Sequence, residues 1–269
     1  MIIMPHPYGQ MANRLILAST FIAHAEETGN SFLHLAFADY FRYFEGTRHN
    51  PVIFYRSTTP QQHRKDRMFG CVNIWNTHDK RGETYWLHED HFLSLEQRSR
   101  CLFVIGWSFR TQHSVKHRDL LRRLFTPISR HRDAVAKLVE AARPRSGHLV
   151  GVHIRQTDYR KFLNGKYFYP LSVYRRVMDE LAAQLNSPVR FLLCSDAPVD
   201  KTAFRGLDII SATGHPVEDN YALAACDYIV GPPSTYTAWA SFYGQVPKRF
   251  ILSADDPIFL DSFDIQETI

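Results

Sequence analysis

The sequence lacks any segment that could cross a membrane as a helix. No stretch approaches the roughly 20 consecutive apolar residues that span a bilayer. The opening MIIMPHPYG has no basic region and too short an apolar run for a secretory signal. Cysteine is also scarce: the 4 cysteines form no CxxC pair, and Cys194 and Cys226 lie in apolar surroundings typical of free thiols. We therefore expect a cytoplasmic protein, with peripheral association at the inner face of the membrane left open.

Several catalytic and metal-binding motifs are missing as well. There is no P-loop, no GxSxG and no Cys/His signature. The segment HEDH (88–91) is not HExxH and has no apparent third ligand, so we expect no metal site. The basic run KHRDLLRRLF (116–125) is interleaved with leucines, which is typical of a helix with a solvated basic face. The net charge of +5 suits a small anionic ligand, and we expect no nucleic-acid partner.

What the sequence has is an alternation of short apolar runs with longer helical patterns. The order is typical of βαβ units, so the predicted fold class is α/β with parallel sheets. The predicted strands are residues 2–5, 32–37, 101–106, 149–154, 190–195, 227–231 and 249–253. The predicted helices are residues 10–28, 115–125, 129–142, 171–186, 218–226 and 234–243.

The best candidate for an inter-domain linker is ARPRSGH (142–148), which carries Pro, Gly and Ser between a helix and a strand. It divides the chain into an N-terminal domain (1–145) and a C-terminal domain (146–250). A C-terminal tail (251–269) follows, and it could pack back on the N-terminal domain. Residues 46–100 have no strong period, and such a long irregular insertion often carries a binding surface.

Polar residues follow the first predicted strand and open the first helix. Gly9 lies in the turn, and Asn13 and Arg14 lie in the first helical turn. Such a turn exposes backbone N–H groups at a helix N-terminus, where an anion can bind. Simple helix initiation would produce the same pattern, so the turn alone does not decide between the two.

The segment GVHIRQTDY (151–159) is the strongest signal. His153 and Arg155 are two residues apart, so they share one strand face near its carboxyl end, where ligands bind in open α/β sheets. The fork of Arg155 can hold two phosphate oxygens at once. Asp158 follows in the loop, within reach of a substrate hydroxyl as a general base. The alternative is a surface ion pair between Arg155 and Asp158 beside a hydrogen-bonded, half-buried His153.

Three further places carry polar groups at strand or helix ends. Asp196 follows the strand FLLCS, where it could hold a ribose or base edge or simply form a turn. Asp219 is a candidate N-cap of the helix predicted at 218–226. Ser234 and Thr235 open the next helix, where either capping or phosphate binding would place them.

Taken in order, these motifs resemble the bacterial α1,2-fucosyltransferase family, part of a wider superfamily of α1,2-, α1,6- and protein O-fucosyltransferases. GQMANRLILA is similar to the family's opening GGLGNQMFQYA, and HIRQTDY to its HxR(R)xDY motif. CSD follows the next strand, and STYTAWASFYG resembles SSFSWWGAWL. The resemblance covers most of the chain except 46–100. Two features depart from it: Gln156 stands where the family usually has a second arginine, and the opening glycines are reduced.

The resemblance implies a GT-B fold, two Rossmann-like domains facing across a cleft. It implies inverting, metal-independent transfer of fucose from GDP-fucose to a glycan hydroxyl, with no cofactor. Arg155 would anchor the diphosphate together with Ser234 and Thr235, and His153 would brace the donor. Asp196 and Asp219 would contact ribose or base, or support the site, and Asp158 would be the base. The glycan acceptor would bind the N-terminal domain through 46–100.

Two rival functions stay open from the sequence. One is transfer from another nucleotide-sugar on the same fold. The other is a non-catalytic relative that binds a nucleotide-sugar or a glycan and has lost turnover together with the second arginine.

Overall fold

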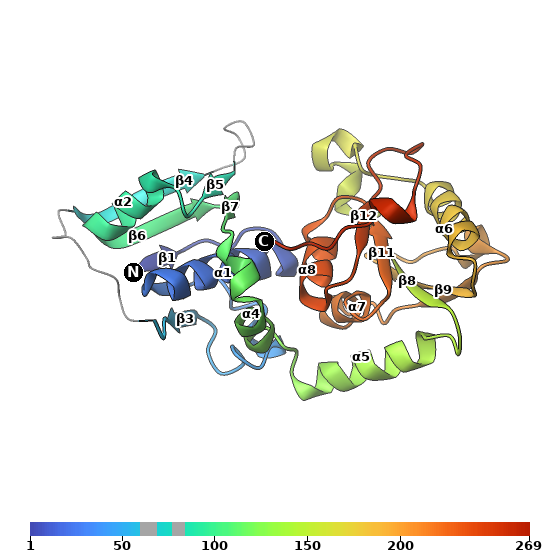
Figure 1. The fold of residues 1–269 in the computed structure, drawn as a ribbon, viewed down its shortest axis with the longest axis horizontal. Coiled ribbons are helices and arrows are strands. Elements are labelled where there is room, and N and C mark those ends of the chain that lie inside the picture. The colour runs from blue at the N-terminus through green and yellow to red at the C-terminus, as the bar shows by residue number, and fades with distance from the viewer. Residues whose placement is uncertain (60–68, 77–83) are drawn as a thin grey trace. The chain divides into compact units, whose positions relative to one another are not determined.

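The computed structural model describes residues 1–59, 69–76 and 84–269, which form two compact units (Figure 1). The first unit is Met1–Ile128 with Glu267–Ile269, and the second is Ser129–Gln266. The sequence placed the boundary at 145, after helix α5 (Ser129–Ala142). In the structure α5 groups with the second unit, because Ala142 and its apolar stripe pack on Ala222 and Leu223. Of the predicted tail, only the last three residues group with the first unit.

The first unit is built on a five-stranded sheet in the order β3-β2-β1-β6-β4, in which only the β2–β3 pair is antiparallel. The strands are β1 (Ile2–Met4), β2 (Ser31–His34), β3 (Ile53–Arg56), β4 (Phe69–Asn76) and β6 (Ser99–Gly106). A two-stranded sheet pairs β5 (Tyr85–Trp86) with β7 (Phe109–Arg110). The helices are α1 (Met11–Thr28), α2 (Asp90–Arg98), α3 (His113–Lys116) and α4 (Arg118–Leu124).

Helix α1 confirms the helix predicted at 10–28. Nearly all of its residues are buried, because strands β2, β3 and β7 and helices α3 and α4 surround it within the unit. Gly29 ends the helix in the left-handed conformation, φ 70°, which glycine adopts without strain. No described helix, α1 included, is long and apolar enough to cross a membrane.

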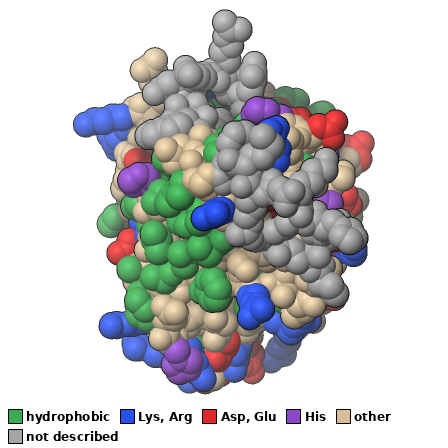
Figure 2. All heavy atoms as spheres, turned by 90° about the vertical axis from the view of Figure 1, so that its left-hand side faces the viewer, with side chains coloured by type: hydrophobic (Ala, Val, Ile, Leu, Met, Phe, Trp, Pro, Cys, Tyr) green, Lys and Arg blue, Asp and Glu red, His purple; other side chains and the backbone are tan. Residues whose placement is uncertain are grey.

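Figure 2 shows one face of the first unit, on which hydrophobic side chains gather. Among the described residues of this unit, three large apolar side chains are exposed by more than two fifths: Leu35, Phe54 and Val115. Phe54 belongs to β3, inside the segment 46–100, which has no strong period in the sequence. Part of that segment lies outside the described residues.

The second unit is built on a fully parallel five-stranded sheet in the order β10-β9-β8-β11-β12. The strands are β8 (His148–Ile154), β9 (Val189–Ser195), β10 (Asp208–Ser211), β11 (Tyr228–Gly231) and β12 (Lys248–Phe250). The helices are α5, α6 (Leu171–Leu185), α7 (Pro216–Leu223) and α8 (Thr235–Gly244). Both sheets confirm the predicted α/β class with parallel strands.

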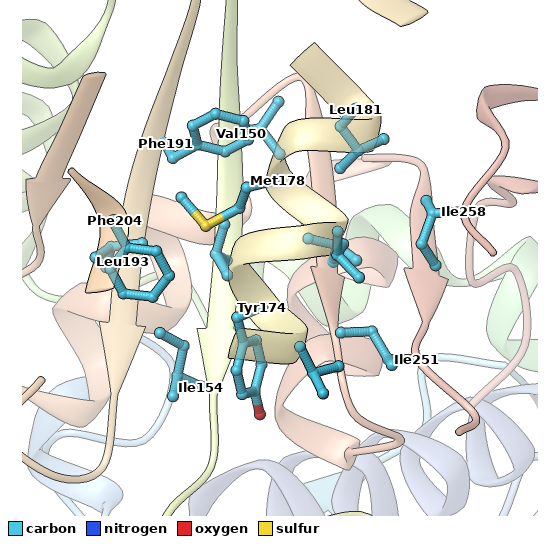
Figure 3. Packing of buried hydrophobic residues seen from close by; sticks show 14 of the residues in the cluster. Val150, Ile154, Tyr174, Met178, Leu181, Phe191, Leu193, Phe204, Ile251 and Ile258 are labelled. Carbon is cyan, nitrogen blue, oxygen red and sulfur yellow. The ribbon is translucent and has the colours of Figure 1, made fainter. Parts of the chain in front are cut away.

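Alternate residues of β8 pack on opposite faces of this sheet. Val150, Val152 and Ile154 join the core under α6, which also takes in Tyr174 (Figure 3). Leu149 lies in the other core, under α5, α7 and α8. Because side chains alternate along a strand, His153 must lie on the α7 and α8 side.

Candidate functional site

The strand order of the second unit reverses at β8. The chain runs outward from β8 through β9 to β10, and then returns to the other side of β8 for β11 and β12. In open α/β sheets, ligands bind outside the carboxyl ends of the strands at such a switch point. Here those ends lead into residues 155–158 after β8 and 232–234 after β11, which are the segments that the sequence indicated.

Arg155 lies one residue beyond the end of β8, with only 13% of its side chain exposed. Its Nη2 donates to Asp158 Oδ1 at 2.5 Å, and its Nη1 is 3.4 Å from Asp196 Oδ2. The Nε is buried and has no hydrogen-bond partner. A guanidinium has five N–H donors and buried donors are nearly always paired, so this one is incompletely satisfied by the protein.

Asp196 follows β9 and is held by the loop that carries Arg155. It accepts from the Gln156 backbone N–H at 2.7 Å and from the Thr157 hydroxyl at 2.5 Å. Burial raises the pKa of Asp196, but these hydrogen bonds and the charge of Arg155 outweigh it and hold the pKa below its usual value. The carboxylate therefore fixes the loop after β8. The sequence left two roles open for Asp196, holding a ribose or base edge and forming a turn. The turn role accounts for these contacts.

The Gln156 side chain is engaged within the protein. Its Nε2 donates to the Tyr169 carbonyl at 2.9 Å, while its own carbonyl accepts from Arg160 Nε at 3.2 Å. The side chain thus ties the loop after β8 to the residues just before α6.

Tyr159 joins the loop after β8 to the N-terminus of α8. The Arg155 guanidinium carbon lies 4.9 Å from its ring centroid, and its hydroxyl donates to the Pro233 carbonyl at 2.6 Å. Ser234 confirms the predicted N-cap, because its Oγ accepts from the Tyr236 N–H at 3.1 Å. The cation of Arg155 and the positive end of α8 are therefore connected through one aromatic side chain.

His153 is buried on the α8 side of the sheet, with 3% of its surface exposed. Its Nδ1 is 2.9 Å from the Thr237 Oγ1, and its ring lies 4.8 Å from that of Tyr236. Burial, assisted by the positive charge of Arg155, lowers the pKa of His153 to about 3 despite Asp196. A neutral, hydrogen-bonded imidazole in this place braces the end of β8 against α8.

A glycine allows this packing between β8 and β11. A Cβ added to Gly231 would lie 2.6 Å from the His153 carbonyl oxygen and 2.9 Å from its Cβ. Any side chain there would push the end of β11 away from β8, so the geometry of the switch point depends on a residue that the sequence analysis did not single out.

Asp219 is not the N-cap that the sequence suggested. Helix α7 begins three residues earlier, at Pro216, and its N-cap is His215. Asp219 is buried in the first turn and accepts from the Thr213 N–H and hydroxyl, both at 2.9 Å, and from the Gly214 N–H. Burial raises its pKa in spite of these bonds. Its carboxyl group is thus occupied in shaping the 213–215 turn.

Thr235 is the first residue of α8 in the second unit, whereas Gly9, Asn13 and Arg14 lie in the first unit. Gly9 has φ 61°, and the Asn13 side chain lies over it so closely that a Cβ on Gly9 would clash. Arg14 donates to the Gly9 and Ala36 carbonyls and to Asp39 at 2.6 Å. Its guanidinium therefore holds the loops after β1 and β2 together.

Besides Gly231, the sequence did not indicate Thr157, Tyr159, Tyr174 and Thr237 as site residues. Thr157 and Tyr159 stand inside the segment GVHIRQTDY, so proximity in sequence could have indicated them. Tyr174, on α6, accepts from the Arg155 backbone N–H at 3.3 Å. It belongs to an ordinary apolar helix stripe, which carries no signal of a site.

The arrangement is suited to binding an anion. A partly satisfied guanidinium, the first-turn N–H groups of α8 and the hydroxyls near Ser234 all supply donors, and a buried site strengthens such bonds. Asp158 is 54% exposed and occupies one side of the Arg155 fork. An incoming phosphate would compete with this carboxylate for the same nitrogen.

Comparison with solved structures places this fold among known ones. A mutant of Arabidopsis thaliana FUT1 in complex with GDP matches at a TM-score of 0.62 with 11% identity, over 98% of this chain and 73% of that one. POFUT1 in complex with GDP-fucose matches at 0.59 with 12% identity, over 94% and 97%.

The fucosyltransferase NodZ from Bradyrhizobium matches at 0.54 with 17% identity, over 89% and 92% of the two chains. No family model matches the sequence, and no curated protein matches it. At these identities the likeness is one of fold. The chain therefore has the two-sheet α/β architecture of GT-B type that these fucosyltransferases share.

Proposed function

We propose that the protein is a glycosyltransferase that moves fucose from GDP-fucose to a hydroxyl group of a glycan. The observation that carries the proposal is Arg155, a buried guanidinium with an unpaired Nε at the switch point of the second unit. The fold supports it, since similar structures were solved with GDP and with GDP-fucose. The proposed linkage is α1,2, as the sequence motifs imply, and the proposed stereochemistry is inverting.

In this proposal Arg155 and the N-terminus of α8 bind the diphosphate of the donor. Negative charge grows on the diphosphate as the bond to the sugar breaks, and fixed donors aimed at that charge stabilise the transition state by about 3–4 kcal/mol each. These donors come from the protein, so no metal ion is needed for the transfer. Asp196 and Tyr159 act indirectly, by holding the Arg155 loop and the start of α8 in place.

Asp158 is the proposed general base, and its pairing with Arg155 sets a condition on that role. Its Oδ1 accepts from the Arg155 guanidinium at 2.5 Å, so the carboxylate is engaged within the protein. Diphosphate binding to Arg155 would release Asp158, whose side chain is half exposed. The freed carboxylate could then take the proton of the acceptor hydroxyl. The acceptor site itself is proposed on the first unit, in the segment 46–100.

The first experiment measures nucleotide binding. Thermal shift and calorimetry with GDP, UDP and GDP-sugars should show GDP and GDP-fucose bound best by the wild-type protein. Arg155→Ala should weaken GDP binding by about 100-fold with an unchanged circular dichroism spectrum, because a buried phosphate then loses its charged partner. Arg175→Ala is the matched control, since that arginine pairs with Asp179 on the exposed side of α6. Equal GDP affinity in the wild-type and Arg155→Ala proteins would overturn the proposal.

The second experiment measures turnover of GDP-fucose with and without glycan acceptors. Asp158→Asn should lower kcat by about 100- to 10,000-fold, the effect of losing a general base. The KM for the donor should fall, because the neutral amide competes less with the phosphate for Arg155. EDTA should leave the wild-type transfer rate unchanged, and a strong loss would contradict the metal-independent step. If GDP binds but neither transfer nor donor hydrolysis occurs, the non-catalytic alternative replaces the enzyme.

A further inference from the structure

Three metal-ligating side chains of the second unit meet where α5 packs on α7. They are His131 of α5, His215 at the N-cap of α7, and Glu218 in the first turn of α7. Each offers one ligand atom, and these atoms all lie within 4.8 Å of one another. Among the residues that the structure describes, this is the one such group of three or more histidines, cysteines and acidic residues. It shares no residue with the site around Arg155.

Local structure and packing both bring the three side chains together. His215 and Glu218 are three residues apart at the start of a helix, so they lie on the same side of it. His131 comes from α5, whose apolar stripe packs on α7. The His131 Nδ1 is 2.9 Å from Glu218 Oε1, and the two imidazole centroids are 4.6 Å apart with their planes at 24°. His131 is 5% exposed, so the cluster is shielded on the α5 side.

We propose that His131, His215 and Glu218 bind a divalent transition metal ion, with Zn²⁺ as the ion that fits best. Imidazole nitrogens with one carboxylate oxygen are a ligand set that zinc accepts, whereas Ca²⁺ and Mg²⁺ prefer oxygen alone. Ligand atoms around tetrahedral zinc lie about 3.3 Å apart, given bonds of about 2.0–2.2 Å. The three ligand atoms, which now lie within 4.8 Å of one another, would therefore move closer together by at most about 1.5 Å on binding.

Binding has a cost in local hydrogen bonds: coordination through His131 Nδ1 would replace its bond to Glu218, and a second bond is lost at His215. Its Nδ1 accepts a hydrogen bond from the Val217 N–H at 3.3 Å. A neutral imidazole that binds an ion through either nitrogen cannot also accept that bond. The bond is long, and one hydrogen bond is weak beside coordination of a metal ion. In return the ion joins α5 to α7, with three protein ligands and a fourth position for water. The inference is independent of the proposed function, and the ion takes no part in the transfer.

The test uses the full chain, dialysed against EDTA and returned to chelator-free buffer. Titration with ZnCl₂ should show one saturable site per chain by calorimetry and a raised Tm, and CoCl₂ should give the visible absorption of a tetrahedral site. Glu218→Gln should bind Zn²⁺ at least about tenfold more weakly, because an amide lacks the anionic oxygen. This variant keeps a hydrogen-bonding group opposite His131, so it is expected to fold.

The double variant His131→Gln, His215→Gln should lose the site and the rise in Tm. His148→Gln is the matched control, because this partly exposed histidine of the same unit lies at the start of β8. It should bind Zn²⁺ as the wild-type protein does. The proposal is overturned if the wild-type protein shows no saturable site, or if the double variant and the wild-type protein bind Zn²⁺ with the same stoichiometry and affinity.

Discussion

At the scale of single residues, the segment from His153 to Arg155 contains both a neutral imidazole and a guanidinium cation. Arg155 retains a buried Nε without a protein partner, whereas His153 has its Nδ1 paired with Thr237. The difference follows from position. His153 still belongs to β8 and faces α8, while Arg155 lies beyond the strand in the loop. The same short segment therefore supplies one group for a ligand and one for packing.

The neutral state of His153 predicts a specific pH dependence of stability. Its folded pKa, about 3, lies below the value of about 6.5 in an unfolded chain, so protonation favours unfolding. Its contribution to stability is complete above pH 6.5 and is lost as the pH falls toward 3. The loss is about 1.4 kcal/mol per pH unit, or about 2.7 kcal/mol at pH 4.5.

His153→Gln should remove this part of the slope. Urea unfolding at pH 7 and pH 4.5 should show a smaller fall in the free energy of unfolding for the variant than for the wild-type protein. Burial and the charge of Arg14 lower the pKa of His34 to about 4, and this histidine contributes to the pH dependence of stability in both the variant and the wild-type protein. His148→Gln should retain the wild-type slope. A wild-type slope in His153→Gln would show that this imidazole is not held neutral.

At the scale of elements, the end of β11 and the start of α8 set the geometry of the site. Ser234 caps α8, Pro233 accepts from Tyr159, and Gly231 leaves room for His153. The contacts of Pro233 and Gly231 join the β11–α8 connection to β8 and to the loop after it, and the Ser234 cap fixes the start of α8. Small changes here should affect both stability and ligand binding.

Gly231→Ala should destabilise the protein by about 1–3 kcal/mol, the usual cost of adding a methyl group where backbone atoms leave no space. Donor binding should weaken too, because β11 and the N-terminus of α8 must move away from β8. Chemical denaturation and GDP titration measure the two effects. Gly70→Ala is the control, since its added Cβ would meet no atom of the described residues within 4 Å. Unchanged stability in Gly231→Ala would contradict the crowding.

The elements that the sequence predicted, and those that it missed, differ in burial. Strands β8, β9 and β11 are continuous apolar runs because both faces of the sheet are covered, so composition alone locates them. Strand β3 (IFYR) is four residues long, pairs only with β2, and is buried at one position. Helix α2 buries only Phe92 and Glu96. Neither leaves a clear pattern in the sequence.

At the scale of the whole molecule, the chain contributes to its first unit twice. Residues 1–128 build it, and Glu267–Ile269 return to it after the second unit is complete. Ile269 is 2% exposed. Its carbonyl accepts from the Thr20 hydroxyl at 3.1 Å, and its N–H donates to the Ser114 Oγ at 3.3 Å.

Ile269→Ala should lower the free energy of unfolding by about 2–4 kcal/mol, because a buried side chain is truncated while the backbone bonds remain. Denaturant unfolding followed by circular dichroism measures this. Ile265→Ala should have a small effect, since that side chain is 37% exposed. Equal stabilities for the two variants would mean that the last residues contribute no packing to the unit.

The sequence by itself determined the α/β class, most strands and helices, and the position of Arg155 at the end of β8. These follow from apolar periodicity and from turn chemistry, which act over a few residues. Tertiary structure alone decided that Thr237 pairs with His153, 84 residues away, and that His131 meets Glu218 across 87 residues. Such contacts depend on strand order and on which helix covers which face, and no short segment carries that information.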